Sequence, residues 1–180
     1  MQVLKFGGTS VANAEAIQKV VEITSKSVDR DRTILVVSAI RGCTDSLVRI
    51  GNLASERDES YKDVIDDLQR QHHQIIKELL PVEKHDESRE VCDSLFDSLR
   101  SIAQGVYLLG ELSPTSLDAI QGFGELWSSK IIAARVAISI TRERVFFHLG
   151  TFEKSLWLSN TESLSSVTSW LGRSLKPIVA

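Results

Sequence analysis

The chain has 180 residues, of which 42% are hydrophobic and 25% charged, as is ordinary for a globular domain that buries a core. Its formal net charge of -3 gives no broad basic surface, which excludes nucleic acid and anionic membranes as expected partners. Cys43 and Cys92 stand far apart without a CxxC or histidine-rich motif, so we expect neither a disulfide framework nor a metal site built from protein ligands. The start MQVLKF does not resemble a secretory leader, and no apolar run reaches the roughly 18 residues of a membrane helix, so we expect one cytoplasmic domain.

The first third of the chain repeats a pattern of strand, loop and helix. A short β-prone run ends in two glycines, and apolar residues then recur at helical spacing. The next run is almost unbroken in apolar and β-branched residues, which is typical of a strand buried on both faces. Such repetition favours a parallel sheet with right-handed crossovers. The expected segments are strands at 3–6 and 33–39, helices at 16–23 and 47–53, and a loop at 41–45.

The middle of the chain reads as a helical insertion. Over 56–109 polar residues dominate, and the apolar ones recur at helical spacing in two blocks, which indicates an antiparallel helical pair. Pro81 and the charged stretch 83–90 are expected to connect the two helices, because proline breaks a helix and the charged stretch lacks apolar periodicity. A further helix is expected to begin at Ser113-Pro114 and to run to about residue 134, with serine as its N-cap.

The first motif with a chemical meaning is Lys5-Phe6-Gly7-Gly8-Thr9-Ser10, at the end of the first strand. Adjacent glycines let the backbone approach a phosphate, and the start of the next helix adds a positive dipole end. A lysine beside them would neutralise charge that develops during phosphoryl transfer. The alternative is an ordinary tight turn with a solvated lysine, since the spacing matches neither a P-loop nor a dinucleotide fingerprint.

The second motif, Ser38 to Asp45, follows the second strand. Open α/β sheets bind ligands in the loops at the carboxyl ends of their strands, so two small-residue loops at one edge indicate a site more strongly than either alone. The alternative is that Thr44 or Asp45 simply caps the next helix.

The third motif is Gly122-Phe123-Gly124-Glu125, inside an otherwise apolar helical pattern. Glycine weakens a helix by roughly 1 kcal/mol relative to alanine, so its presence there indicates a close approach by another part of the chain. Glu125 would then meet an ammonium group of a substrate. The alternative is a helix that packs tightly on the sheet and directs this carboxylate into water.

Taken together, three segments resemble aspartokinases, members of the amino acid kinase family. They are KFGGTSVA at the amino terminus, VVSAIRGCTD some thirty residues later, and FGELWSS near residue 125. The stretch YLLGELSP before the third segment is similar to the form of this domain that is fused to homoserine dehydrogenase. The resemblance implies an α/β fold of the carbamate kinase-like type, with three layers and a largely parallel sheet, here incomplete and carrying the helical insertion.

The resemblance also implies a reaction and its site. Aspartokinases use ATP and Mg²⁺ to phosphorylate the side-chain carboxylate of L-aspartate, the first step toward lysine, threonine and methionine. Phosphoryl transfer needs hydrogen-bond donors and positive charge more than a covalent nucleophile, which agrees with the residues present. The resemblance implies that Lys5 is catalytic and stabilises the transferred phosphoryl group, that Gly7, Gly8 and Thr9 contact phosphate, that Ser38 and Thr44 hold aspartate or the nearby phosphate, and that Glu125 binds the substrate's α-amino group.

The resemblance fades after about residue 135, so we divide the chain into an aspartokinase-like part at 1–140 and a divergent tail at 141–180. A truncated or frameshifted product is one hypothesis for the tail, and a genuine tail that packs as a strand and a helix is the alternative. Without the second half of the fold, we expect poor ATP binding and little kinase activity. An open sheet edge would favour self-association or aggregation, and we expect a homo-oligomer. A non-catalytic interaction or regulatory module is the alternative function.

Overall fold

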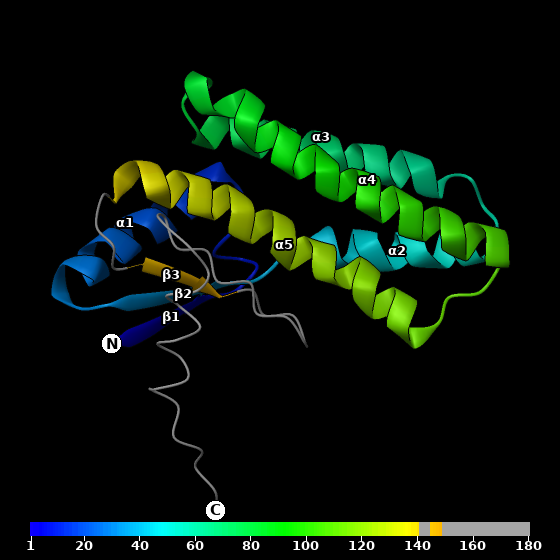
Figure 1. Ribbon diagram of the computed structural model, residues 1–180, viewed down its shortest axis with the longest axis horizontal. Helices are drawn as coiled ribbons and strands as arrows, with labels where there is room; N and C mark the ends of the chain where they lie inside the picture. Colours follow the sequence, from blue (N-terminus) through cyan, green and yellow to red (C-terminus); the bar gives the residue numbers. More distant parts are fainter. Residues whose placement is uncertain (141–144, 149–180) are drawn as a thin grey trace, which may run out of the picture.

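The structure is a computed structural model that describes residues 1–140 and 145–148. Figure 1 shows a small sheet at one end of the molecule and long helices that extend away from it. Of the divergent tail predicted at 141–180, only residues 145–148 are described, and the rest of the tail and the hypotheses about its origin lie outside the described residues.

Among the described residues, three parallel strands form the sheet, in the order β1-β2-β3. They are β1 (Gln2–Phe6), β2 (Thr33–Val37) and β3 (Val145–His148), and Phe6 pairs with Val37 at the carboxyl end of the first two. The parallel sheet predicted from the repeated pattern is therefore confirmed. Strand β2 ends two residues earlier than expected, and its residues alternate between buried and half-buried, so only one face is fully covered by the described residues.

Helix α1 (Ala14–Arg30) connects β1 to β2, and α2 (Cys43–Ser55) follows β2. The side chain of Asn13 caps α1 by accepting a 2.9 Å hydrogen bond from the amide of Ala16. Helix α2 has Gly42 as its N-cap and no capping side chain. The expectation that Thr44 or Asp45 caps α2 is therefore wrong, because the helix has already begun at Cys43.

The predicted helical pair is present as α3 (Tyr61–Leu79) and α4 (His85–Leu109), which lie side by side in Figure 1. Their connection is shorter than expected. A single 3-10 turn, η1 (Val82–Lys84), follows Pro81, and α4 then starts within the charged stretch that the sequence indicated as a connection. The first turns of α4 are exposed or half-buried, so they show no apolar periodicity that a sequence analysis would recognise as a helix.

The long helix α5 (Pro114–Ser139) joins the two ends of the molecule. It starts as predicted, with Ser113 accepting a hydrogen bond from the amide of Ser116 and proline in the first turn. Helix α5 contacts β2 and α1 at one end and α2 and α4 along the rest of its length. One continuous hydrophobic core results, which includes Leu35 of the sheet and Trp127 of α5, both with no exposed surface.

Candidate active site

The loops after β1 and β2 begin side by side. The amide of Ser38 donates a 3.0 Å hydrogen bond to the carbonyl of Phe6, which extends the ladder between the strands by one step. Both loops therefore leave the same edge of the sheet, at the carboxyl ends of its strands. This is the place where open parallel sheets bind ligands.

The first loop, residues 7–13, turns tightly against the second. The amide of Ser10 donates to the carbonyl of Gly7 at 2.9 Å. A Cβ atom on Gly8 would lie 3.2 Å from the carbonyl oxygen of Ala39, so this position is nearly closed to any side chain. The side chains of Lys5 and Thr9 are exposed and make no hydrogen bond or ion pair with other described residues. They are available to a ligand.

The second loop, residues 38–42, leads directly into α2. Gly42 has a φ of +80°, a left-handed conformation that side chains rarely adopt. The amide of Cys43 donates to the carbonyl of Ile40 at 2.9 Å. No described side chain caps this helix, so the next two amides, of Thr44 and Asp45, are open to an anion, and the helix dipole favours negative charge there. Ser38 is half-buried just before this turn, and Thr44 is exposed in the first turn of α2.

The third motif reaches the same place from α5. A Cβ atom on Gly124 would lie only 2.7 Å from the Cβ of Ala39 and 3.4 Å from the sulfur of Cys43. The close approach that glycine indicated at this position is thus confirmed. Glu125 follows and is half-buried. Because Gly124 packs against Cys43, the neighbouring Glu125 belongs to the turn of α5 that lies at the start of α2. Burial, and after it the charge of Glu125, raises the pKa of the Cys43 thiol to about 12.

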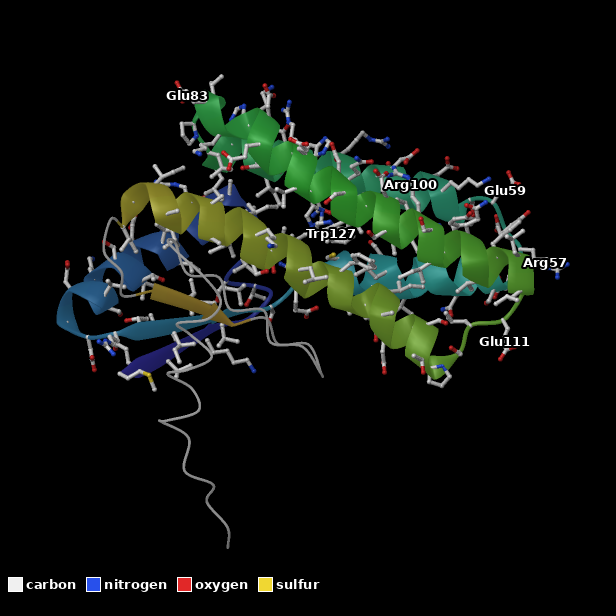
Figure 2. The ribbon with its side chains drawn as sticks, in the orientation of Figure 1. Arg57, Glu59, Glu83, Arg100, Glu111 and Trp127 are labelled. Atoms are coloured by element: carbon white, nitrogen blue, oxygen red, sulfur yellow. The ribbon has the colours of Figure 1, made fainter. Side chains whose placement is uncertain are left out.

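An aromatic cluster between α3, α4 and α5 was not predicted from the sequence. The ring of Trp127 stacks on Phe96 with centroids 4.1 Å apart, and its indole N–H donates to the carbonyl of Cys92 at 3.3 Å. His72 packs against both rings. Figure 2 shows Trp127 pointing from α5 into the space between the helices. A signal was present, because His72 lies four residues after Leu68 and four before Ile76, on the apolar face of α3.

The arrangement suits an anion at the loops and an ammonium group at Glu125. An exposed lysine, backbone amides and an uncapped helix start are groups that bind phosphate. Within 1–140 and 145–148, no group of three or more histidine, cysteine, aspartate or glutamate residues is placed to hold a metal ion. A Mg²⁺ ion is usually held through substrate phosphates and only one or two carboxylates, so these residues fit a metal that arrives with a nucleotide. In the same described ranges, no helix is long and apolar enough to cross a membrane.

Comparisons with known proteins agree with this geometry. The sequence model described as "Amino acid kinase family" matches residues 1–165, and so extends into the segment predicted to diverge. The chain is 31% identical over 132 residues to bifunctional aspartokinase/homoserine dehydrogenase 1, chloroplastic, of Arabidopsis thaliana, and 30% identical over 137 residues to the same enzyme of Zea mays. These matches cover 73% and 76% of the chain, which spans only 14% and 15% of the two relatives.

Solved structures of aspartokinases are also similar to this chain. The chain is similar to E. coli aspartokinase III, crystallised with aspartate and ADP, with a TM-score of 0.65 and 25% identity. This likeness covers 76% of the chain and 29% of the bacterial enzyme. The predicted fold is therefore confirmed, as is the similarity to aspartokinases. From the extent of the family match, the chain belongs to the amino acid kinase family.

Proposed function

We propose that this chain carries the aspartate-binding and phosphate-binding part of an aspartate kinase, which transfers the γ-phosphoryl group of ATP to the side-chain carboxylate of L-aspartate. The observation that carries the proposal is the contact of α5 with the second loop at Gly124, which brings Glu125 to the edge of the sheet where both loops begin. The similarity to aspartokinases over three quarters of the chain supports the choice of aspartate.

Each predicted residue has a role in this proposal that fits its surroundings. Glu125 accepts hydrogen bonds from the α-ammonium group of aspartate. Ser38 and Thr44, as hydroxyl donors in and after the second loop, hold its carboxylates or the phosphate beside them. The amides of Gly7 and Gly8 and the hydroxyl of Thr9 contact phosphate oxygens, and the Lys5 ammonium group neutralises charge on the phosphoryl group in transit.

In the reaction, an oxygen of the aspartate side chain attacks the γ-phosphorus of ATP. A new phosphorus–oxygen bond forms while the bond from this phosphorus to the β–γ bridging oxygen breaks, so the products are aspartyl phosphate and ADP. The carboxylate is already ionised at neutral pH and needs no general base. The protein therefore acts by positioning and by electrostatic stabilisation, and Mg²⁺ bound to the nucleotide would shield phosphate charge.

The whole reaction, its nucleotide and a homo-oligomeric assembly are proposals for this chain, because it spans about a seventh of the plant relatives' length. A cytoplasmic location also stays a prediction, since those relatives are named as chloroplastic. Binding of aspartate is the property that the described residues support most directly.

Titration calorimetry of the chain with L-aspartate, and separately with succinate, tests the proposal. Succinate has both carboxylates but no amino group, so we expect it to bind more weakly than aspartate. Glu125→Gln should weaken aspartate binding by about tenfold to a hundredfold, because a hydrogen bond to a charged group contributes about 1.5–3 kcal/mol. The affinity for succinate should change little.

The control is Glu111→Gln, which neutralises an exposed glutamate in the connection between α4 and α5, labelled in Figure 2. It should leave both affinities unchanged. If the chain does not distinguish aspartate from succinate, or if Glu125→Gln binds aspartate as well as the parent does, the proposed function is wrong. A parallel titration with Mg²⁺ and ATP would show whether the nucleotide side is also present.

A further inference from the structure

Ala39 stands at the meeting point of all three motifs. Its carbonyl oxygen faces Gly8 of the first loop, at 3.2 Å from the position of a Cβ atom there. Its methyl group faces Gly124 of α5, at 2.7 Å from the position of a Cβ atom on that helix. Ala39 is itself buried, with 5% of its surface exposed. One small residue thus separates the first loop, residues 7–13, which we call the phosphate loop, from the helix that carries Glu125.

We propose that Ala39 and Gly124 form a positioning contact, which sets how far Glu125 lies from the phosphate loop and so determines the affinity for the substrate's amino group. This inference rests on the proposed function and extends it to two residues that do not themselves touch substrate.

The contact leaves no room for adjustment. Carbon atoms in van der Waals contact prefer separations of about 3.5–4.0 Å, so a methyl group at 124 would have to move α5 or the loop by about 1 Å. The neighbour on the other side is not a flexible side-chain end but the Cβ of a buried residue next to the backbone. Glu125 is the next residue in α5 and would move with the helix.

The other contacts of Gly124 are less restrictive. The same added Cβ would lie 3.4 Å from the sulfur of Cys43 and 3.4 Å from a methyl carbon of Leu47, which is ordinary contact. The methyl group of Ala39 is therefore the specific obstacle. Removing it should make room for alanine at 124, which gives the proposal a compensating variant.

The test compares Gly124→Ala with the double variant Ala39→Gly/Gly124→Ala, by titration calorimetry with L-aspartate and with succinate. Gly124→Ala should lower the affinity for aspartate by about tenfold or more, because a displacement of about 1 Å is enough to disrupt a positioned charge contact. It should lower the affinity for succinate much less. The double variant should recover most of the aspartate affinity.

A matched control is Gly105→Ala in α4, where an added Cβ would meet nothing within 4 Å. It makes the same chemical change inside a helix and should leave the affinity for aspartate unchanged. Circular dichroism of each variant shows whether the fold is retained. If Gly124→Ala fails to fold, the double variant still tests the proposal. A double variant that folds but does not prefer aspartate to succinate would contradict the positioning role.

The outcomes separate this inference from the proposed function. If the parent chain prefers aspartate to succinate and a folded Gly124→Ala variant keeps that preference, the positioning contact is refuted and the proposed function stands. Loss of the preference without recovery in the double variant also refutes it. If the parent chain shows no preference at all, both proposals are overturned.

Discussion

His72 is a neutral base held inside an aromatic cluster. Its Nδ1 lies 2.8 Å from the carbonyl of Leu68, and because a carbonyl only accepts, this nitrogen carries the proton. The other nitrogen, Nε2, is buried without a hydrogen-bond partner among the described residues. Burial lowers the pKa of His72 from 6.5 to about 4, with the bond to Leu68 acting in the opposite direction and the charge of His73 adding slightly to the decrease.

This shift makes stability depend on pH. His72 takes up a proton near pH 6.5 in the unfolded chain but only near pH 4 in the folded chain. Neutral His72 therefore makes its full contribution to the free energy of unfolding above pH 6.5, and this contribution is lost as the pH falls from 6.5 to about 4. Between pH 7 and pH 5 the loss from this group should be about 2 kcal/mol. Between pH 7 and pH 5, the free energy of unfolding of His72→Phe should therefore fall by about 2 kcal/mol less than that of the parent chain. Urea unfolding at both pH values measures it, and equal losses in the two proteins would contradict the assignment.

At the scale of residues, the sequence was most informative where backbone geometry restricts the choice of amino acid. Gly124 was recognisable because glycine destabilises a helix and is therefore expected there only where another segment comes close. The contact with Ala39 is that close approach. The cap of α1 was missed, although asparagine directly before a helical pattern is a known signal. The role of Ala39 was not predictable, because a small apolar residue carries no mark of which segments meet at it.

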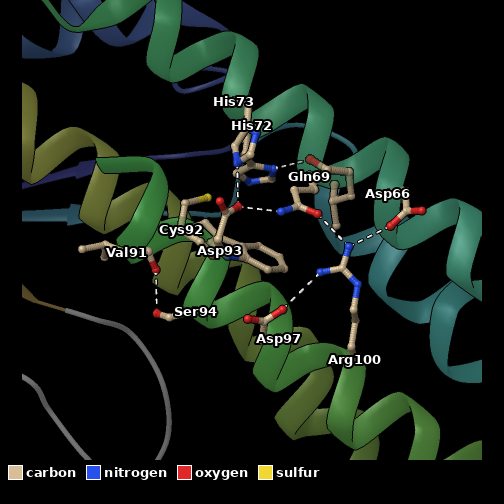
Figure 3. Close-up of polar contacts among 12 residues, drawn as sticks. Asp66, Gln69, His72, His73, Val91, Cys92, Asp93, Ser94, Asp97 and Arg100 are labelled. Atoms are coloured by element: carbon tan, nitrogen blue, oxygen red, sulfur yellow. Dashed lines mark hydrogen bonds and ion pairs between the residues drawn. The ribbon is translucent and has the colours of Figure 1, made fainter. Parts of the chain in front are cut away.

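At the scale of elements, a polar network joins α3 to α4, as Figure 3 shows. Arg100 of α4 donates to Gln69 at 2.6 Å and to Asp66 at 2.7 Å. Gln69 in turn donates to Asp93 at 2.5 Å, and this carboxylate also bonds to His73. Gln69 is half-buried between the two helices and is the member that links the two ends of the network.

Gln69→Leu should therefore lower the free energy of unfolding by about 1 kcal/mol, because it removes the two hydrogen bonds that Gln69 makes to α4. The matched control is Gln74→Leu on the same helix, where an exposed amide bonds only to Glu78 within α3. That change should cost less than about 0.5 kcal/mol. Chemical unfolding followed by circular dichroism compares them, and equal costs would show that the network does not hold α3 to α4.

Element order was predictable because apolar periodicity distinguishes strands from helices, and here the strands and helices alternate early in the chain. The start of α4 could not be predicted in this way, because its first turns lie at the surface and need no apolar residues. The start of α2 was misjudged for a related reason. Its N-cap is a glycine with a left-handed backbone, so no capping side chain marks the position.

At the scale of the whole molecule, α5 makes the sheet and the helical pair depend on each other. Trp127 lies at the centre of the helical part, Leu35 lies in the sheet, and both belong to one continuous core. We expect the chain to unfold in one transition, as single domains of this size usually do. In a Trp157→Phe/Trp170→Phe background, the fluorescence of Trp127 and the hydrogen exchange of β2 amides should show the same denaturant midpoint. Separate midpoints would mean that the two parts unfold independently.

The glycine at position 42 also has an evolutionary consequence. A serine or aspartate that caps a helix normally has an extended backbone, and a φ of +80° does not allow that conformation. Selection for stability alone would therefore be expected to replace this turn with an ordinary capped one, at the price of the open amides that a phosphate needs. Variants selected only for resistance to heat would be expected to accumulate changes around residue 42, and each such change should weaken phosphate binding at the start of α2.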